Sequence, residues 1–382
     1  MSTARACLIT TLSLALLVSC GDGAMSIDDG PVLVDLTERP PERLSHMRLL
    51  SWDPATESIR YNTRVVPYEL NTPLFSDFAL KARALYIPEG AAAAYNPERP
   101  LDLPIGSVIV KTFYYPADLR EPERDITLIE TRVLRHTTSG WETWPYIWNA
   151  DQTDATLQVG GETRSITFVD VAGESRTASY LVPQRNQCRS CHERNVGEGG
   201  ATVLTPIGPA ARHLNRDFDY GDGPVNQLSH LRDMGMLDGL PALEEVPAAY
   251  DFMAVRDAPE AIADADVDRA ARDYLDINCA HCHDADGVQG VTSQLFLNHD
   301  NTDEFRLGFC KRPGSAGAGT GGRVYDIVPG SPDESILMFR VETTEVGAMM
   351  PLLGRSLEHN QGSALIRRWI QGMEPIDCDA GG

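Results

Sequence analysis

Two copies of the pattern Cys-x-x-Cys-His carry the clearest chemistry in this sequence. One copy spans residues 188–192 and the other spans residues 279–283. In each copy the two thiols lie one helical turn apart, so both can add to the vinyl groups of one porphyrin while the adjoining imidazole reaches the iron. The pattern therefore predicts two covalently bound haem c groups. Their attachment points are Cys188, Cys191, Cys279 and Cys282, and their axial iron ligands are His192 and His283.

A Cys-x-x-Cys pair also occurs in zinc sites and in thioredoxin-like redox proteins. Zinc takes four Cys or His ligands, and two distant pairs that are each followed by His make an irregular set. A redox pair calls for a preceding strand in a βαβ unit, and the sequence shows no such unit. Because the same trailing His occurs twice, the pattern favours haem attachment.

The sequence does not single out one residue as the ligand opposite His192 on the first iron. The candidates are Met234, Met236, His213 and His230, and none of them stands in a Met-Pro turn. A vacant or water-filled position would open this haem to small-molecule chemistry, whereas a filled position would make it an electron relay.

The first twenty residues predict export. Arg5 supplies a positive charge, an apolar stretch runs from residue 6 to residue 18, and Leu17-Val18-Ser19-Cys20 has the form of a lipobox. We expect a signal peptide at 1–19 and lipidation of Cys20, with an ordinary secretory signal as the alternative. The mature protein would then be anchored by lipid on the periplasmic side of a bacterial membrane, and Gly21 favours the outer membrane over the inner one.

Two further cysteines, Cys310 and Cys378, remain in the C-terminal part of the chain. In an oxidising periplasm a disulfide between them is the simplest expectation, and two free buried thiols are the alternative.

The formal net charge of −22 argues against binding to nucleic acid or to anionic lipid headgroups. It favours a basic or neutral redox partner, so the expected contact with the membrane is through the lipid anchor alone. No Gly-rich phosphate loop, nucleophile elbow or His-Glu-x-x-His helix occurs in the sequence. We therefore assign no catalytic residue.

Short alternating apolar runs between turn residues predict strands from about residue 46 to residue 180. Examples are 84–87, 107–114, 126–134 and 165–169. Three tryptophans at 141, 144 and 148 are interpreted as sheet core, with a carbohydrate or aromatic-ligand platform as the alternative. Residues 238–262 are interpreted as a linker. A helix is expected at 264–276, a second helix with a capping box opens at Ser331, and a closing helix contains 365–373.

The order of these C-terminal elements resembles a class I cytochrome c domain, in which the first and last helices cross. That resemblance implies Met350, in the turn Met350-Pro351, as the second ligand of the iron bound by His283, since cytochrome c domains present this ligand from a Met-Pro turn. A thioether ligand would raise the reduction potential relative to a second imidazole. Met349 is the rival, core packing is the alternative for both methionines, and His359 is a more distant candidate.

Two further expectations follow for this domain. The crossing would bring Tyr274 near Trp369. His281, inside the second motif, is expected at the surface because the motif assigns iron to His283.

We therefore expect an α+β multidomain chain with an N-terminal β-rich, sandwich-like domain followed by mostly α-helical haem-binding regions. The boundaries are 1–19 for the signal peptide, 20–45 for a tether, 46–180 for the β-rich domain, 181–261 for the first haem-binding region and 262–382 for the cytochrome c-like domain.

Nearly all of the mature chain resembles a bacterial family of exported di-haem c-type cytochromes. The resemblance is carried by the segments at 186–192 (NQCRSCH), 274–283 (YLDINCAHCH) and 349–370, from Met-Met-Pro to Trp-Ile. It implies two haems and a partner protein with parallel β-helix repeats.

The expected function is single-electron transfer in the cell envelope. The alternative is a haem enzyme, either a di-haem peroxidase or the cytochrome subunit of a periplasmic dehydrogenase.

Overall fold

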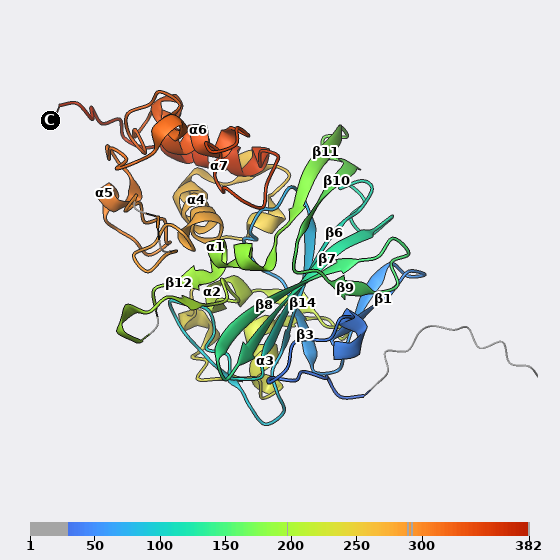
Figure 1. Cartoon of the computed structure of the whole chain (residues 1–382). Coiled ribbons are helices and arrows are strands. Elements are labelled where there is room, and N and C mark those ends of the chain that lie inside the picture. The colour runs from blue at the N-terminus through green and yellow to red at the C-terminus, as the bar shows by residue number, and fades with distance from the viewer. Residues whose placement is uncertain (1–29, 197, 289, 292, 381–382) are drawn as a thin grey trace, which may run out of the picture.

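The computed structural model describes residues 30–196, 198–288, 290–291 and 293–380. The signal peptide expected at 1–19 and the lipidation site Cys20 lie outside these residues. Strands gather on one side of the molecule and the C-terminal helices on the other (Figure 1). The short helix α1 (Arg189–His192), which belongs to the first motif, lies where the two parts meet.

A six-stranded antiparallel sheet forms the centre of the N-terminal part, in the order β3-β4-β6-β7-β8-β9. Its central strands have runs of consecutive buried residues, and since successive side chains point to opposite faces, both faces of the sheet are largely covered. Their bounds are Val65–Tyr68 (β3), Leu80–Tyr86 (β4), Val108–Tyr115 (β6), Thr127–Thr137 (β7), Gly140–Trp148 (β8) and Ala155–Leu157 (β9).

Two hairpins cover parts of this sheet. The hairpin of β1 (Leu50–Asp53) and β2 (Ser58–Tyr61) contributes Leu50 and Trp52 to one core cluster of the sheet. The hairpin of β10 (Glu162–Val169) and β11 (Ser175–Val182) packs against a different cluster around Phe113. The sandwich expected from the sequence is thus one large sheet flanked by two-stranded hairpins.

The tryptophans expected in the sheet core are mostly there. Trp144 and Trp148 are buried in the cluster that also holds Tyr146. Trp141 is only partly buried and stacks on His136 with ring centroids 4.6 Å apart.

Short elements connect the sheet to the C-terminal part. The expected linker at 238–262 is packed rather than extended, because Val246, Phe252 and Ile262 are buried among core residues. The helices of this region are α2 (Ala211–Leu214) and α3 (Gln227–Asp233). Its short strands are β12 (Glu193–Arg194), β13 (Val203–Leu204), β14 (Asp217–Asp219), β15 (Pro224–Asn226) and β16 (Leu237–Asp238), the last paired with β5 (Ala93–Ala94).

The C-terminal part contains the helices expected at its two ends. They are α4 (Val267–Leu275), which continues as a π-helical turn through Asp276–Ala280, and α7 (Asn360–Gln371); α5 (Glu304–Leu307) and α6 (Ile336–Glu342) lie between them. The capping box expected at Ser331 is wrong: a 3-10 turn (Pro332–Glu334) comes first, and the extended backbone of Ser335 separates it from α6.

Helices α4 and α7 pack together, but not through the contact expected from the sequence. Tyr274 lies at the start of α7, where its hydroxyl bonds Nδ1 of His359 at 2.8 Å. Trp369 instead donates from Nε1 to Asp268 at 2.8 Å, near the start of α4. Each end of α4 therefore meets the opposite end of α7.

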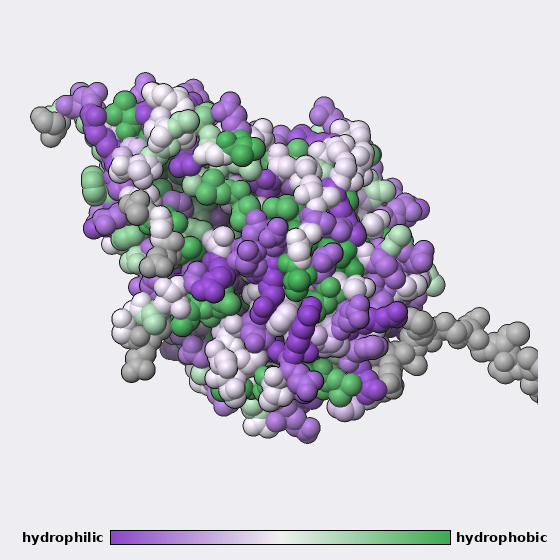
Figure 2. All heavy atoms as spheres, viewed as in Figure 1, coloured by the Kyte–Doolittle hydropathy of each residue, from purple (hydrophilic) through white to green (hydrophobic). Residues whose placement is uncertain are grey.

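Hydrophobic residues reach the surface as small patches among hydrophilic ones on the face seen in Figure 2. Within the described part of the chain, no helix has the length and apolar character needed to cross a membrane.

A disulfide joins Cys310 to Cys378, the pairing expected from the sequence. Because the bond closes a long loop, replacing both cysteines by Ser should lower the free energy of unfolding by about 2–4 kcal/mol. Denaturant unfolding of both proteins, with and without reductant, measures the loss. Reductant should weaken the wild type and leave the double variant unchanged, and equal stability of the two oxidised proteins would contradict the prediction.

Candidate functional site

The two Cys-x-x-Cys-His motifs lie side by side, although almost ninety residues separate them in the sequence. Sγ of Cys282 is 3.4 Å from the carbonyl oxygen of Ser190 inside the first motif. Arg194, just after the first motif, pairs with Asp284, just after the second, at 2.7 Å. Backbone hydrogen bonding between Asn195 and Asp286 at 3.0 Å extends this contact.

His192 of the first motif is held by its local chain. Its Nδ1 lies 2.9 Å from the carbonyl oxygen of Thr205, and the amide of Thr205 donates back to the carbonyl oxygen of His192 at 2.7 Å. This hydrogen bond leaves Nε2 as the free ring nitrogen, which is how a metal-binding imidazole is usually oriented. Burial lowers the pKa of His192 to about 4, so the ring is neutral at pH 7, as coordination requires.

His283 of the second motif has a similar setting. Its Nδ1 lies 3.2 Å from Oγ of Ser293, and its carbonyl oxygen accepts a hydrogen bond from the amide of Leu297 at 2.8 Å. Burial lowers the pKa of His283 to about 4, so this imidazole is also neutral at pH 7. Both expected iron ligands are therefore half-buried, neutral and fixed through Nδ1.

A cavity lies against the first motif. It is bounded by the sheet on one side and by the loop after Met350 on the other. Its walls include Phe75, Lys111, Arg132, Thr143, Cys188, Cys191, His192, His281, Pro351 and Leu353. The mixture of apolar walls, two thiols, two imidazoles and two cations fits the chemistry of a haem. At about 90 Å³ the cavity is smaller than a haem, so the surrounding side chains must move to admit one.

His281 corrects an expectation from the sequence. It is 7% exposed rather than at the surface, because the second motif packs directly on the first. A hydrogen bond with Cys282, followed by one with His281, holds the pKa of Cys191 below its usual value. Nδ1 of His281 has no hydrogen-bond partner within the described residues. A buried nitrogen of the second motif therefore borders the cavity of the first.

The four candidates for the opposite ligand of the first iron do not line this cavity. Met236 is fully buried in the core below α3, and Met234 is 37% exposed. His230 stacks on Tyr220 with ring centroids 3.6 Å apart. His213 is buried, with Nε2 3.0 Å from a guanidinium nitrogen of Arg212. His281 is better placed than any of them.

Met350 lies on the loop between α6 and α7. Its amide donates to the carbonyl oxygen of Arg340 at 2.8 Å, and the Arg340 charge contributes to the lowered pKa of His283. Its neighbour Pro351 lines the cavity of the first motif. Met349 is tied by its amide to the carbonyl oxygen of Glu345 at 2.9 Å.

His359, the more distant candidate, is engaged elsewhere. It bonds Tyr274, as described above, and its ring stacks on Phe75 with centroids 4.1 Å apart. Burial lowers its pKa to about 3, so it is a neutral core group at pH 7.

A second, larger cavity of about 550 Å³ adjoins the first motif from the other side. It is lined by polar and titratable side chains, among them Arg99, His136, Arg194, Arg212, His213, His281 and His299. Cys191 borders both cavities, so a haem attached there would have room for a small molecule beside it.

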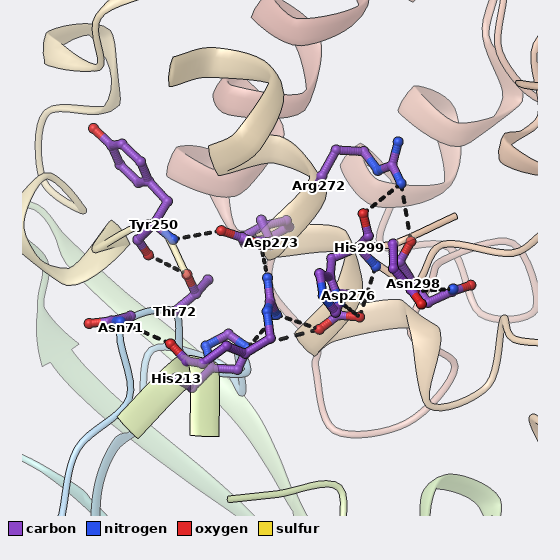
Figure 3. A network of polar contacts seen from close by, with 12 residues as sticks. Asn71, Thr72, His213, Tyr250, Arg272, Asp273, Asp276, Asn298 and His299 are labelled. Atoms are coloured by element: carbon purple, nitrogen blue, oxygen red, sulfur yellow. Dashed lines mark hydrogen bonds and ion pairs between the residues drawn. The ribbon is translucent and has the colours of Figure 1, made fainter. Parts of the chain in front are cut away.

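A buried network of charges joins the elements that support the two motifs (Figure 3). Arg212 of α2, which is 6% exposed, binds Asp273 of α4 and lies 2.8 Å from Asp276. Asp276 also accepts a hydrogen bond from the amide of His299 at 3.1 Å. Although burial opposes ionisation, the hydrogen bonds from His213 and His299 and the Arg212 charge hold the pKa of Asp276 below its usual value.

Sequence reasoning missed this network and the cations that face the first motif. Lys111 interrupts an apolar strand, and this break in the alternation was the available signal. Within the described residues, no group of three or more His, Cys, Asp or Glu side chains could hold a metal ion.

No protein-family model, curated protein or solved structure matches this chain.

Proposed function

We propose that this protein is a di-haem c-type cytochrome that transfers single electrons. The observation that carries the proposal is the direct contact between the two Cys-x-x-Cys-His motifs, each with a half-buried, neutral histidine fixed through Nδ1. Haem bound at each motif would supply a redox-active iron. The chain would hold both groups on adjoining backbone segments, which gives electrons a short path between them.

The C-terminal part supports this proposal through its architecture. Helices α4 and α7 pack together, the second motif follows α4 directly, and the Met-Pro turn precedes α7. This order is the one expected for a class I cytochrome c domain, and we propose that fold for the region. The β-rich part would then shield the first haem, because its sheet forms one wall of the cavity.

Replacing Met350 by Ala should abolish the weak sulfur-to-iron absorption band of the oxidised protein and make one reduction potential more negative. Loss of a thioether ligand removes the preference for Fe(II) that it confers. Visible spectroscopy of the purified oxidised protein tests this, with Met349→Ala as the matched control. A band that survives in Met350→Ala and disappears in Met349→Ala would reverse the assignment.

The larger cavity beside Cys191 favours a second candidate function, a haem enzyme such as a di-haem peroxidase or the cytochrome subunit of a dehydrogenase. Such an enzyme needs an open iron with an acid or base next to it. Optical and paramagnetic resonance spectra separate the two functions. Two low-spin haems that ignore cyanide and peroxide support the electron carrier, whereas a high-spin haem that reacts with either supports the enzyme.

For the cell, we propose an exported protein that is anchored by lipid at Cys20, with the outer membrane favoured. The net charge of −22 suits a basic or neutral periplasmic redox partner, and the family resemblance adds a β-helix repeat protein as a candidate. Incorporation of labelled palmitate into the wild type and not into Cys20→Ala would test the anchor.

A further inference from the structure

Three cationic side chains lie in a row across the large sheet. Arg83 of β4 is paired directly with Lys111 of β6, and Lys111 is paired directly with Arg132 of β7. Lys81 lies two residues from Arg83 on the same face. We call these four side chains the basic row. Like charges placed opposite one another destabilise a sheet, so the row needs a compensating anion.

The protein itself supplies few carboxylates to balance the positive charge of the basic row. Within the described residues, the one carboxylate that forms an ion pair with the row is that of Glu130, at 2.6 Å from Arg132. Glu130 is fully buried, receives two hydrogen bonds from Arg132 and also accepts from the hydroxyl of Tyr180 at 2.7 Å. Arg132 has an ion-pair partner, and among the described residues no carboxylate forms an ion pair with the other three side chains.

Lys111 shows the deficit most clearly. Its ammonium lies 5.0 Å from the ring centroid of Phe113, and no hydrogen bond or ion pair reaches it within the described residues. Burial, followed by repulsion from Arg83 and Arg132, lowers its pKa to about 7. Lys81 and Arg83 find only backbone carbonyl oxygens, those of Ala79 at 2.8 Å and Lys81 at 3.2 Å. Buried cations without a counter-charge are costly to a fold.

The row leads away from the first motif. Arg132 and Lys111 line the same cavity as Cys188 and His192. Lys81 and Arg83 line a neighbouring cavity of about 460 Å³, and Leu74 and Phe75 border both cavities. Since strands are spaced by roughly 5 Å, Arg83 lies about 10 Å beyond Arg132.

We propose that Lys111, Arg83 and Lys81 bind the propionate carboxylates of the haem attached at the first motif, an inference that rests on the proposed function. The edge of a haem that forms thioethers lies opposite the edge that carries the propionates. Cysteines near one end of the row therefore direct the carboxylates towards the other end. Arginine binds a carboxylate through two parallel hydrogen bonds, and lysine acts as a point charge.

The first test is the reduction potential of Lys111→Met. Removing a positive charge beside the haem should make one of the two potentials more negative and leave the other in place. Arg60→Met is the matched control, because it removes the same charge from a partly buried pair with Asp53 on the β1–β2 hairpin. A shift of either potential in Lys111→Met no larger than in Arg60→Met would overturn the proposal.

The second test measures the stability of Lys111→Met against denaturant. The substitution should stabilise or destabilise the protein according to whether the first haem is present. Lys111→Met should lower the denaturant midpoint of the protein that carries both haems. In a background of Cys188→Ser and Cys191→Ser, which lacks the first haem, the same substitution should raise the midpoint because it relieves repulsion. The same direction of change in both backgrounds would contradict the proposal. Lys81→Met provides a second variant if Lys111→Met does not fold.

The haem content of these samples distinguishes failure of the propionate proposal from failure of the proposed di-haem function on which it rests. If the wild type carries no haem at the first motif, the proposed function fails and the row lacks its ligand. If haem is present and the potentials and midpoints follow the control, only the assignment of the propionates is overturned.

The chain has three lysines, Lys81, Lys111 and Lys311. Amine labelling should therefore show protection of Lys81 and Lys111 in wild type and reaction of both in the Cys188→Ser, Cys191→Ser variant.

Discussion

Replacing Arg212 by Ala should lower the free energy of unfolding by about 3–5 kcal/mol, because it leaves two carboxylates without their shared cation. Asp273 is 3% exposed and retains only the amide of Tyr250, which donates to it at 2.6 Å. Asp276 retains the hydrogen bond from the amide of His299. Since this network joins α2 to α4, the loss should also loosen the contact between the two motifs.

The dependence of this loss on pH follows from Asp276. Its pKa in the folded protein lies below the ordinary value of 3.8, so its contribution to stability is complete above that value and is lost as the pH falls through the folded pKa. The difference between wild type and Arg212→Ala should therefore shrink as the pH is lowered below about 4. Urea unfolding at several pH values measures it.

Arg124→Ala provides the control for this prediction. Its partner Glu121 is exposed, and the pair should contribute less than about 1 kcal/mol. A loss in Arg212→Ala as small as the loss in Arg124→Ala would show that the buried network is not a support of the fold.

Replacing Cys188 and Cys191 by Ser should remove one of two haems from the purified protein. In the proposed di-haem protein each motif would supply both thiols of one porphyrin, so removing the pair would abolish that attachment and leave the other motif intact. The absorbance of the alkaline pyridine haemochrome, divided by the protein concentration, should fall to half of the wild-type value. The matched double variant at Cys279 and Cys282 should show the same halving.

The outcome that would contradict this prediction is a full haem content in either double variant. Complete loss of haem from only one of them would instead show that a single motif carries all of the haem. Recovery of folded protein can be followed by circular dichroism in the same samples, so that loss of haem is not confused with loss of fold.

Local pattern was sufficient to predict much of the fold. The apolar runs at 107–114 and 126–134 correspond to β6 and β7, because their β-branched and aromatic residues favour the extended backbone of a strand. The apolar spacing at 264–276 and 365–373 corresponds to α4 and α7 within one or two turns. These elements are determined by neighbours in the sequence.

The parts that failed depend on distant neighbours. His281 is buried because the second motif packs on the first, and no local pattern encodes that contact. The basic row arises from strand register, which aligns Arg83, Lys111 and Arg132 from three separate strands. The pairing of Tyr274 with His359 likewise depends on how far α7 slides along α4.

Mass spectrometry of proteolytic peptides from the mature protein tests the di-haem assignment most directly. The peptide containing residues 188–192 and the peptide containing residues 279–283 should each be heavier by one haem, joined through two thioethers. Because Cys191 and Cys282 are in contact, the chain without haem could form a disulfide between them, which the same measurement would detect. Unmodified cysteines, or the two peptides linked by a disulfide between Cys191 and Cys282, would contradict the assignment.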